Sequence, residues 1–136
     1  MISKIFDDDQ WRAVTLAHVY AAARWAATGE DGAGLEGLVY DQLEWGGLKH
    51  GEPLEPTCGT ACCLWGGACA LATNSLPTEG PPEEWAQQSD LHFQVAVLFA
   101  DPYTKPQNIF EAFHQHGYIV NAAGEVFYHD GSQCHV

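Results

Sequence analysis

Hydrophobic side chains in the first part of the chain recur at three- and four-residue steps, which is the spacing of one helix face. Over residues 10–28 the repeating positions are Trp11, Val14, His18, Ala21 or Ala22, and Trp25. Three acids at positions 7–9 precede this segment and Gly29 follows it, as expected for the two ends of a helix. We therefore predict a helix over residues 10–28, with an alanine-rich middle that another backbone can approach closely.

Two more segments in the first half of the chain have helical spacing. Residues 35–45 place Leu35, Leu38, Val39 and Leu43 on one side and end at a Gly-Gly pair, which predicts a second helix. Residues 57–73 predict a third helix, in which small residues fall on two neighbouring lines, Gly59, Cys63, Gly67 and Cys62, Gly66, Ala70. Each internal glycine costs roughly 1 kcal/mol relative to alanine, so we expect this helix to pack closely against the first.

The next region begins with a predicted loop at residues 74–82. Residues 89–99 then fit two patterns: alternation typical of a strand, and a helical face made by Leu91, Val95, Leu98 and Phe99. We favour the helix, with the strand as the open alternative. A fifth helix is predicted from Thr104 to Gly117, with Thr104 and Gln107 as a capping box and Pro106 in the first turn.

Near the end of the chain the pattern changes to short β-rich runs. Residues 118–120 and 125–128 have this character, and Gly124 in the connection can take a positive φ, which predicts a β-hairpin. The predicted fold is α+β and mainly helical, with about five helices and a C-terminal β-hairpin in a single domain over residues 1–136. A lone hairpin is marginal in water, so it should pack on the helices or extend a partner's sheet.

Composition and cysteine usage favour a soluble intracellular protein. Of 136 residues, 46% are hydrophobic, which is enough for one compact core. Residues 1–9 resemble neither a secretory signal nor a transit peptide, and the longest apolar run, residues 61–72, is shorter than the roughly 20 residues that span a bilayer. The five cysteines are an odd number, which favours reduced thiols. We expect a cytoplasmic location.

Charge is the most unusual global property of the chain. Eighteen acids face five bases, for a formal net charge of −13, and after Lys49 the only base is Lys105. Such a field repels nucleic acids and anionic membranes and favours a basic protein partner, although it can also serve solubility alone. The acids that cluster around a loop without a neighbouring base are the candidate partner-binding residues: Glu79, Glu83, Glu84 and Asp90.

A short cysteine-containing segment carries a family resemblance. Residues 58–68 read Cys-Gly-Thr-Ala-Cys-Cys-Leu-Trp-Gly-Gly-Ala. Together with its flanks, a segment of about fifteen residues resembles one in small bacterial and phage proteins of largely uncharacterised activity. Those proteins often have a polar residue or histidine before the second cysteine, where Ala61 stands here. The resemblance implies a helical fold and a bacterial or phage source, and it transfers no activity.

Cys58 is the candidate for thiol chemistry. It lies near the start of the predicted third helix, where unpaired N–H groups would stabilise a thiolate. A thiol-dependent enzyme with His18 or a C-terminal histidine as base is therefore one alternative. Buried cysteines without chemistry are more common, and no motif fixes a Cys–His geometry.

A second alternative is a small zinc-binding protein. His114, His116, His129 and Cys134 lie close in sequence around the predicted hairpin, and zinc prefers four nitrogen or sulfur ligands. The spacing argues against this site, since His114 and His116 point in nearly opposite directions on a helix. We expect no cofactor.

No sequence motif indicates nucleotide chemistry or direct nucleic-acid binding. The chain has no phosphate-binding loop, no dinucleotide fingerprint and no basic patch interleaved with aromatics. Charge and resemblance together favour a non-enzymatic acidic protein-binding domain. In its concrete form this is a phage or mobile-element inhibitor, anti-defence or anti-CRISPR-like, that mimics nucleic acid and occupies the basic groove of a host complex. The oligomeric state stays open.

Overall fold

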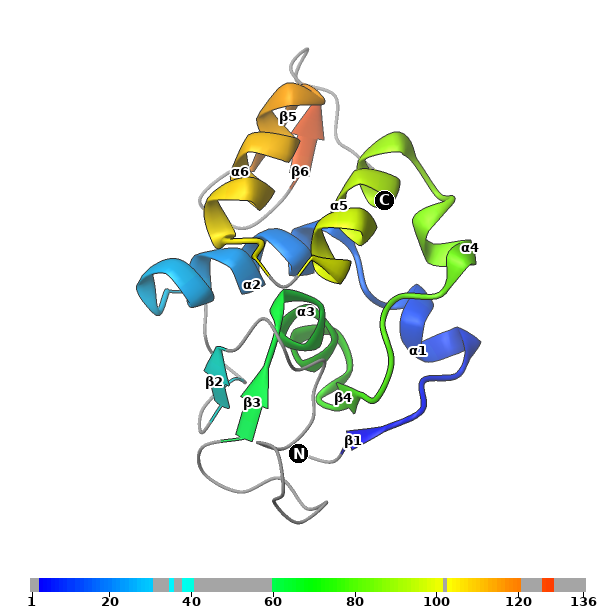
Figure 1. Ribbon diagram of the computed structural model, residues 1–136. Coiled ribbons are helices and arrows are strands. Elements are labelled where there is room, and N and C mark those ends of the chain that lie inside the picture. Colours follow the sequence, from blue (N-terminus) through cyan, green and yellow to red (C-terminus); the bar gives the residue numbers. More distant parts are fainter. Residues whose placement is uncertain are drawn as a thin grey trace.

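The computed structural model describes residues 3–30, 35, 38–40, 60–101, 103–120 and 126–128. The helices in this part of the chain are α1 (Asp8–Arg12), α2 (Leu16–Thr28), α3 (Leu64–Thr73), α4 (Glu83–Ala86), α5 (Asp90–Ala100) and α6 (Pro106–Gln115). The strands are β1 (Ser3–Lys4), β2 (Leu38–Tyr40), β3 (Thr60–Cys62), β4 (Leu76–Pro77), β5 (Tyr118–Val120) and β6 (Val126–Tyr128). The protein is mainly helical, as predicted (Figure 1).

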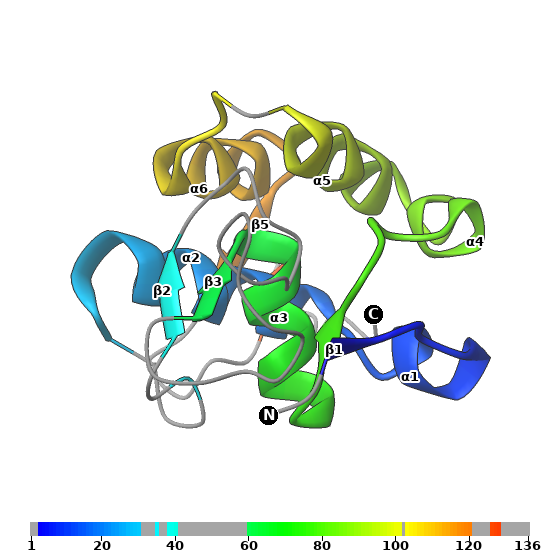
Figure 2. The same cartoon turned by 60° about the horizontal axis from the view of Figure 1, so that its bottom comes forward.

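Helix α2 lies at the centre of the helical assembly. It contacts α3 on one side and α6 on the other, and α5 packs beside α6, as Figures 1 and 2 show from two directions. Most of the largest fully buried side chains come from α2, α3, α4, α5 and α6, among them Leu16, Trp65, Trp85, Phe99 and Phe113. No described helix is long and apolar enough to cross a membrane.

The ambiguous segment at residues 89–99 is helical, as we favoured. Leu91, Val95 and Phe99 are almost completely buried, whereas Phe93 and Val97 are 60% and 52% exposed. A strand buried on one face would have placed all five side chains on the same side. The burial pattern therefore follows the helical spacing and not the alternation.

The predicted close contact between an alanine-rich helix and a glycine-containing helix is confirmed by α2 and α3. A Cβ atom added to Gly67 would lie 3.3 Å from Cβ of Ala22 and 3.4 Å from Cζ3 of Trp25. A hydrogen at this position lets the two backbones approach, so the packing of α3 on α2 offsets the helical cost of glycine.

The single helix predicted at residues 10–28 is wrong, because the chain breaks into α1 and α2 at residues 13–15. Thr15 is extended, with ψ 168°, and serves as the N-cap of α2. Its Oγ1 accepts a hydrogen bond from the His18 backbone N–H at 3.4 Å, and its own N–H donates to Nδ1 of His18 at 3.1 Å. These bonds start a new helix inside the hydrophobic repeat.

The helix predicted at residues 35–45 is also wrong where the structure describes it. Residues 38–40 form β2, which pairs in parallel with β3 in the register Leu38↔Thr60. The third helix correspondingly begins later than predicted, at Leu64, with Cys63 as its N-cap. Pairing between distant segments has overridden local helical spacing here. Residues 41–59, including Cys58, lie outside the described part.

The fifth helix starts one residue later than predicted. The N-cap of α6 is Lys105, whose backbone N–H donates to Oδ1 of Asn108 at 2.8 Å. Asn108 therefore takes the place that we assigned to Gln107. Thr104 is only 5% exposed, and its Oγ1 has no hydrogen-bond partner within the part of the chain that the structure describes.

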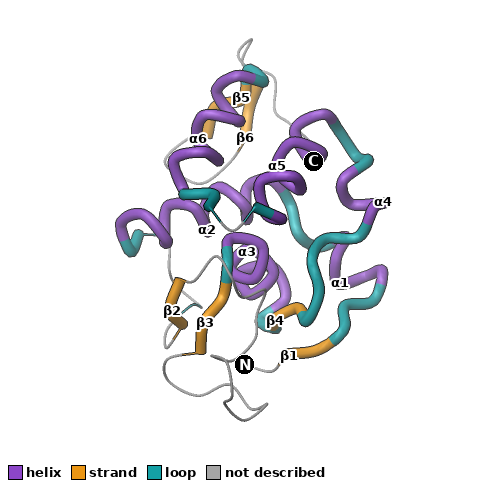
Figure 3. Tube along the Cα trace, viewed as in Figure 1, coloured by secondary structure: helices purple, strands orange, loops and turns teal. Residues whose placement is uncertain are grey.

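The strands form three separate pairs at the edges of the helical assembly (Figure 3). The β1–β4 and β2–β3 pairs are parallel, and both were missed by the sequence analysis. β5 and β6 pair antiparallel in the register Tyr118↔Tyr128. The connection between β5 and β6 lies outside the described residues, so the predicted hairpin and its turn stay a prediction.

Candidate binding pocket

The pocket begins with the pairing of β1 and β4. Lys4 is in register with Pro77, and the Thr78 backbone N–H donates to the Lys4 carbonyl at 3.1 Å. This pairing brings the N-terminal segment alongside residues 78–82, a loop that contains Gly80, Pro81 and Pro82. Because the proline rings fix φ, the loop presents a stiff apolar surface.

Helix α1 forms next to this loop because Asp7 caps it. Oδ1 of Asp7 accepts from the Gln10 backbone N–H at 2.9 Å, and Oε1 of Gln10 accepts from the Asp7 backbone N–H at 3.0 Å. This reciprocal capping box satisfies two backbone donors at the start of the helix. Asp8 and Asp9 occupy the first turn, where negative charge is favoured.

Trp11 supplies one aromatic wall of the pocket. Its side chain is 7% exposed, and its Nε1–H donates to Oδ1 of Asp8 at 3.1 Å. The hydrogen bond holds the indole and the Asp8 carboxylate together. The guanidinium carbon of Arg12 lies 5.0 Å from the centroid of the Trp11 ring, so this indole already carries one cation in a cation–π contact.

Trp65, the second residue of α3, supplies another wall. Its Nε1–H donates to the carbonyl oxygen of Glu79 at 3.1 Å, which ties the loop to the start of α3. Its ring centroid lies 5.0 Å from that of Trp85 and 5.7 Å from that of Phe99. Trp65, which is only 1% exposed, therefore joins the pocket to the aromatic centre of the core.

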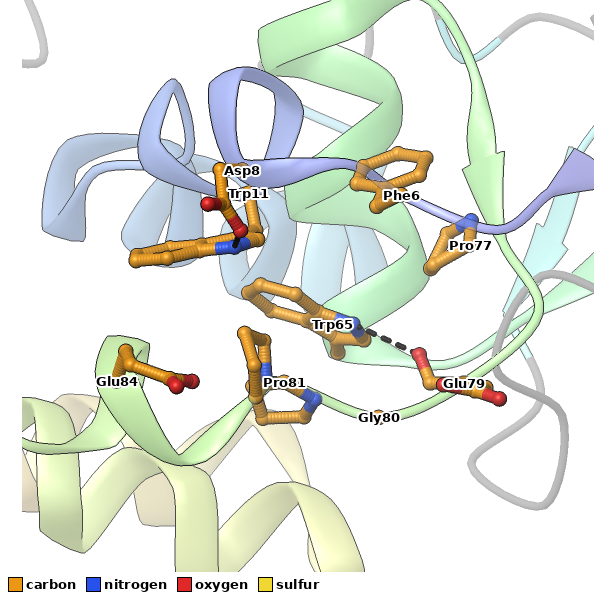
Figure 4. Close-up of a pocket in the computed structure, with 10 residues that line it drawn as sticks. Phe6, Asp8, Trp11, Trp65, Pro77, Glu79, Gly80, Pro81 and Glu84 are labelled. Carbon is orange, nitrogen blue, oxygen red and sulfur yellow. Dashed lines mark hydrogen bonds between the residues drawn. The ribbon is translucent and has the colours of Figure 1, made fainter.

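Together these elements enclose a pocket of about 440 Å³. In Figure 4 the indoles of Trp11 and Trp65 and the ring of Pro81 border the same space, and the Glu84 carboxylate points toward it. The lining residues are Phe6, Asp8, Trp11, Trp65, Pro77, Glu79, Gly80, Pro81, Pro82 and Glu84. Three of them are acids, and none is Lys, Arg, His or Cys.

Two of the four predicted partner-binding acids line this pocket. Glu79 and Glu84 are exposed lining residues, and Figure 4 shows the Glu84 carboxylate pointing toward the space and the Glu79 carboxylate pointing away from it. Glu83, also exposed, lies in the first turn of α4, and its Oε1 accepts from Nε2 of Gln87 at 3.0 Å. Asp90 is exposed at the start of α5, and neither Glu83 nor Asp90 lines the pocket.

The sequence analysis missed Asp8 and Trp11 as site residues. It interpreted the acids at positions 7–9 only as a helix start and Trp11 only as a core position. The available signal is the three-residue separation of Asp8 and Trp11, which places an acceptor beside an indole N–H on one helix face. The apolar wall at Pro77, Pro81 and Pro82 was missed because residues 74–82 were predicted only as a connecting loop.

Two histidines, one buried and one half-buried, do not line the pocket. His92 in α5 is completely buried; its Nδ1 lies 2.7 Å from Oγ of Ser89, and its ring packs 4.8 Å from that of Trp85. Its Nε2 has no hydrogen-bond partner within the described residues, and burial lowers its pKa to about 4. Burial also lowers the pKa of the half-buried His18. Both histidines therefore favour the neutral form.

The zinc and thiol alternatives depend on residues that lie partly outside the described part of the chain, so both stay predictions. His114 and His116 are exposed at the end of α6, and Nδ1 of His116 lies 2.9 Å from the Ala112 carbonyl. His129, Cys134 and Cys58 lie outside the described part. Within that part, no group of three or more His, Cys, Asp or Glu side chains is placed to hold a metal ion.

Comparison with protein families, with curated proteins and with solved structures finds no match to this chain. Functional inference therefore depends on charge and on the pocket.

Proposed function

We propose that the protein is a non-enzymatic binding protein that presents acidic surface to a basic protein partner. The observation that supports this most directly is the pocket, whose lining residues include Asp8, Glu79 and Glu84 and no basic residue. The formal net charge of −13 acts in the same direction, because it steers basic partners and disfavours direct contact with nucleic acid or anionic membrane.

The concrete form of the proposal is an inhibitor of phage or mobile-element origin. Such a protein would occupy the basic groove of a host nucleic-acid-handling complex in place of the nucleic acid. The acidic charge and the resemblance of residues 58–68 to bacterial and phage proteins support this form.

The test is affinity capture from a bacterial lysate on the immobilised full chain. The captured proteins should be basic nucleic-acid-binding proteins, should be released by salt and should be displaced by added duplex DNA, since all three follow from screened charge contacts. The double variant Glu79→Lys, Glu84→Lys should lose capture. Glu111→Lys is the matched control, because it reverses an exposed acid on α6, far from α1 and β4 (Figure 1).

Capture that is unchanged between low and high salt, or equal for the double variant and the control, would contradict the proposal. Retention of proteins with no net basic surface would contradict it as well.

A further inference from the structure

Helix α5 carries a second apolar stripe on the side that faces away from the core. Phe93 and Val97 are 60% and 52% exposed, and Ala100 is exposed as well. These three residues occupy positions i, i+4 and i+7, so they lie along one face of the helix. We call Phe93, Val97 and Ala100 the outer stripe.

The outer stripe makes α5 apolar on two faces. Asp90, His92 and Gln94 are the only polar residues among the 11 of this helix. A single exposed apolar side chain is ordinary on a protein surface, but a helix that is apolar all round is typical of a helix covered on all sides. Phe93 and Val97 also complete the alternating pattern that made this segment resemble a strand, although the fold buries neither. Packing within the described residues therefore does not account for them.

The charged residues near the outer stripe are mostly acids. Asp90 begins α5 and Asp101 follows its end, and α4, which packs against α5, contributes Glu83 and Glu84. All four are exposed. In Figure 2, α4, α5 and α6 lie side by side along one edge of the molecule. The sequence places no Lys or Arg on α4 or α5, and Lys105 is the N-cap of the neighbouring α6.

This charge decides which occupant fits the outer stripe. A second copy of the chain would bring the same acids together, and like charges across an interface oppose association. The helix is also short, about 16 Å for its 11 residues, so one face of it offers less than the roughly 800 Å² per partner of a stable interface. A segment with apolar side chains at helical spacing and Lys or Arg beside them complements both the stripe and the acids.

We propose that the outer stripe of α5 is the docking site for a basic amphipathic helix of the partner. Its apolar side chains pack on Phe93 and Val97, and its Lys or Arg side chains face the acids at the two ends of α5. The inference rests on the proposed function, because it identifies the surface and the kind of segment by which the basic partner is held. Apolar burial supplies affinity, and the acids supply orientation and salt dependence.

The direct test is an NMR titration of the ¹⁵N-labelled full chain with the synthetic helix acetyl-LKKLLKLLKKLLKL-amide, which has leucine on one face and lysine on the other. The backbone amide signals of Phe93, Val97 and Ala100 should shift saturably. The signal of Ala27, exposed on α2, is the internal control and should not shift. A peptide of the same charge with proline at two central leucine positions cannot form the helix and should bind at least tenfold more weakly. Unchanged α5 signals, or equal binding of the proline peptide, would overturn the inference.

Substitutions on the outer stripe test the apolar contact. The double variant Phe93→Ser, Val97→Ser should bind the peptide at least tenfold more weakly, because it removes the apolar surface. Serine has nearly the helix propensity of phenylalanine and valine, so α5 should keep its stability. Ile5→Ser is the matched control, because it removes a 75% exposed apolar side chain outside α5 and should leave binding unchanged. Equal binding by the double variant and the control would contradict the docking site.

A second pair of variants tests the charge. Asp90→Asn should weaken peptide binding about twofold to fivefold, which is the size of an exposed charge interaction. Glu30→Gln should leave binding unchanged, because this exposed acid follows the end of α2 and belongs to neither α4 nor α5. Equal effects of the two substitutions would show that the acids at α5 are not used and would overturn the inference.

Two further measurements separate this inference from its alternatives. Sedimentation of the free chain should be the same for the wild type and the Phe93→Ser, Val97→Ser variant. A dimer that the double variant abolishes would show that a second copy covers the stripe and would overturn the inference. If the double variant keeps full lysate capture that is salt-sensitive and depends on Glu79 and Glu84, the docking inference fails and the proposed function stands. If the wild type captures no basic protein and does not bind the peptide, both proposals are overturned.

Discussion

The buried His92 makes the stability of the fold depend on pH in a direction that can be worked out. Burial lowers its pKa from 6.5 to about 4 in the folded protein, whereas the unfolded chain keeps the ordinary value near 6.5. Between these values the unfolded state binds more protons than the folded state. The free energy of unfolding therefore keeps the full contribution of neutral His92 above pH 6.5, and it decreases progressively as the pH falls toward 4.

The size of this effect follows from the same two pKa values. Each unit of pKa difference corresponds to about 1.4 kcal/mol, so the loss between pH 6.5 and pH 4 is at most about 3 kcal/mol. Out of a typical total stability of about 5–15 kcal/mol, this is a large fraction. Well below pH 4 the group adds no further change, because both states are then protonated.

The measurement is urea unfolding of the wild type and of His92→Leu at half-unit steps from pH 4 to pH 8. Leucine has a similar volume and no titrating group. It also removes the imidazole Nε2 that has no hydrogen-bond partner within the described residues, so at pH 8 the variant should be as stable as the wild type or more stable. The difference between the two proteins should change by about 3 kcal/mol across the range.

Comparing the two proteins isolates His92, because His18 and all eighteen acids are present in both. The reasoning would be refuted by parallel curves, in which the wild type and His92→Leu lose the same stability as the pH falls. It would also be refuted if the wild type gained stability relative to the variant at low pH.

Three further substitutions test separate features of the fold. Gly67→Val should destabilise the protein by about 1–3 kcal/mol in urea unfolding, because its Cβ already meets Ala22 at 3.3 Å, while Ala27→Val on the exposed side of α2 should cost a few tenths. Thr104→Val should leave the free energy of unfolding unchanged or raise it slightly, because the buried Oγ1 has no hydrogen-bond partner within the described residues. A decrease of about 1 kcal/mol would instead support Thr104 as the N-cap. Asp7→Ala should remove the cap of α1 and lower stability by about 1 kcal/mol in urea unfolding.

Local periodicity predicted the helices whose apolar face is buried by neighbouring helices. In α5 the spacing of Leu91, Val95 and Phe99 identified the buried face correctly, and the glycine at position 67 correctly indicated close contact with the alanine-rich helix. In such elements burial and local propensity favour the same conformation, so the sequence pattern is sufficient.

The errors lie where a partner distant in sequence decides the local structure. Residues 38–40 have an acceptable helical pattern, but pairing with residues 60–62 makes them a strand. The break at Thr15 was missed for a different reason. Its reciprocal capping partner is His18 and not the usual Glu or Gln, so the motif gave no recognisable signal.

The pocket shows why acidic site residues are difficult to separate from helix-start residues in a sequence. Asp8 and Glu84 lie in the first turns of α1 and α4, where backbone N–H groups favour negative charge without a basic side chain. The same placement leaves their carboxylates at the pocket without Lys or Arg on its wall. The start of a helix can therefore stabilise an acidic side chain that has no basic partner. Only the pairing of β1 with β4 shows that the starts of α1 and α4 border one pocket.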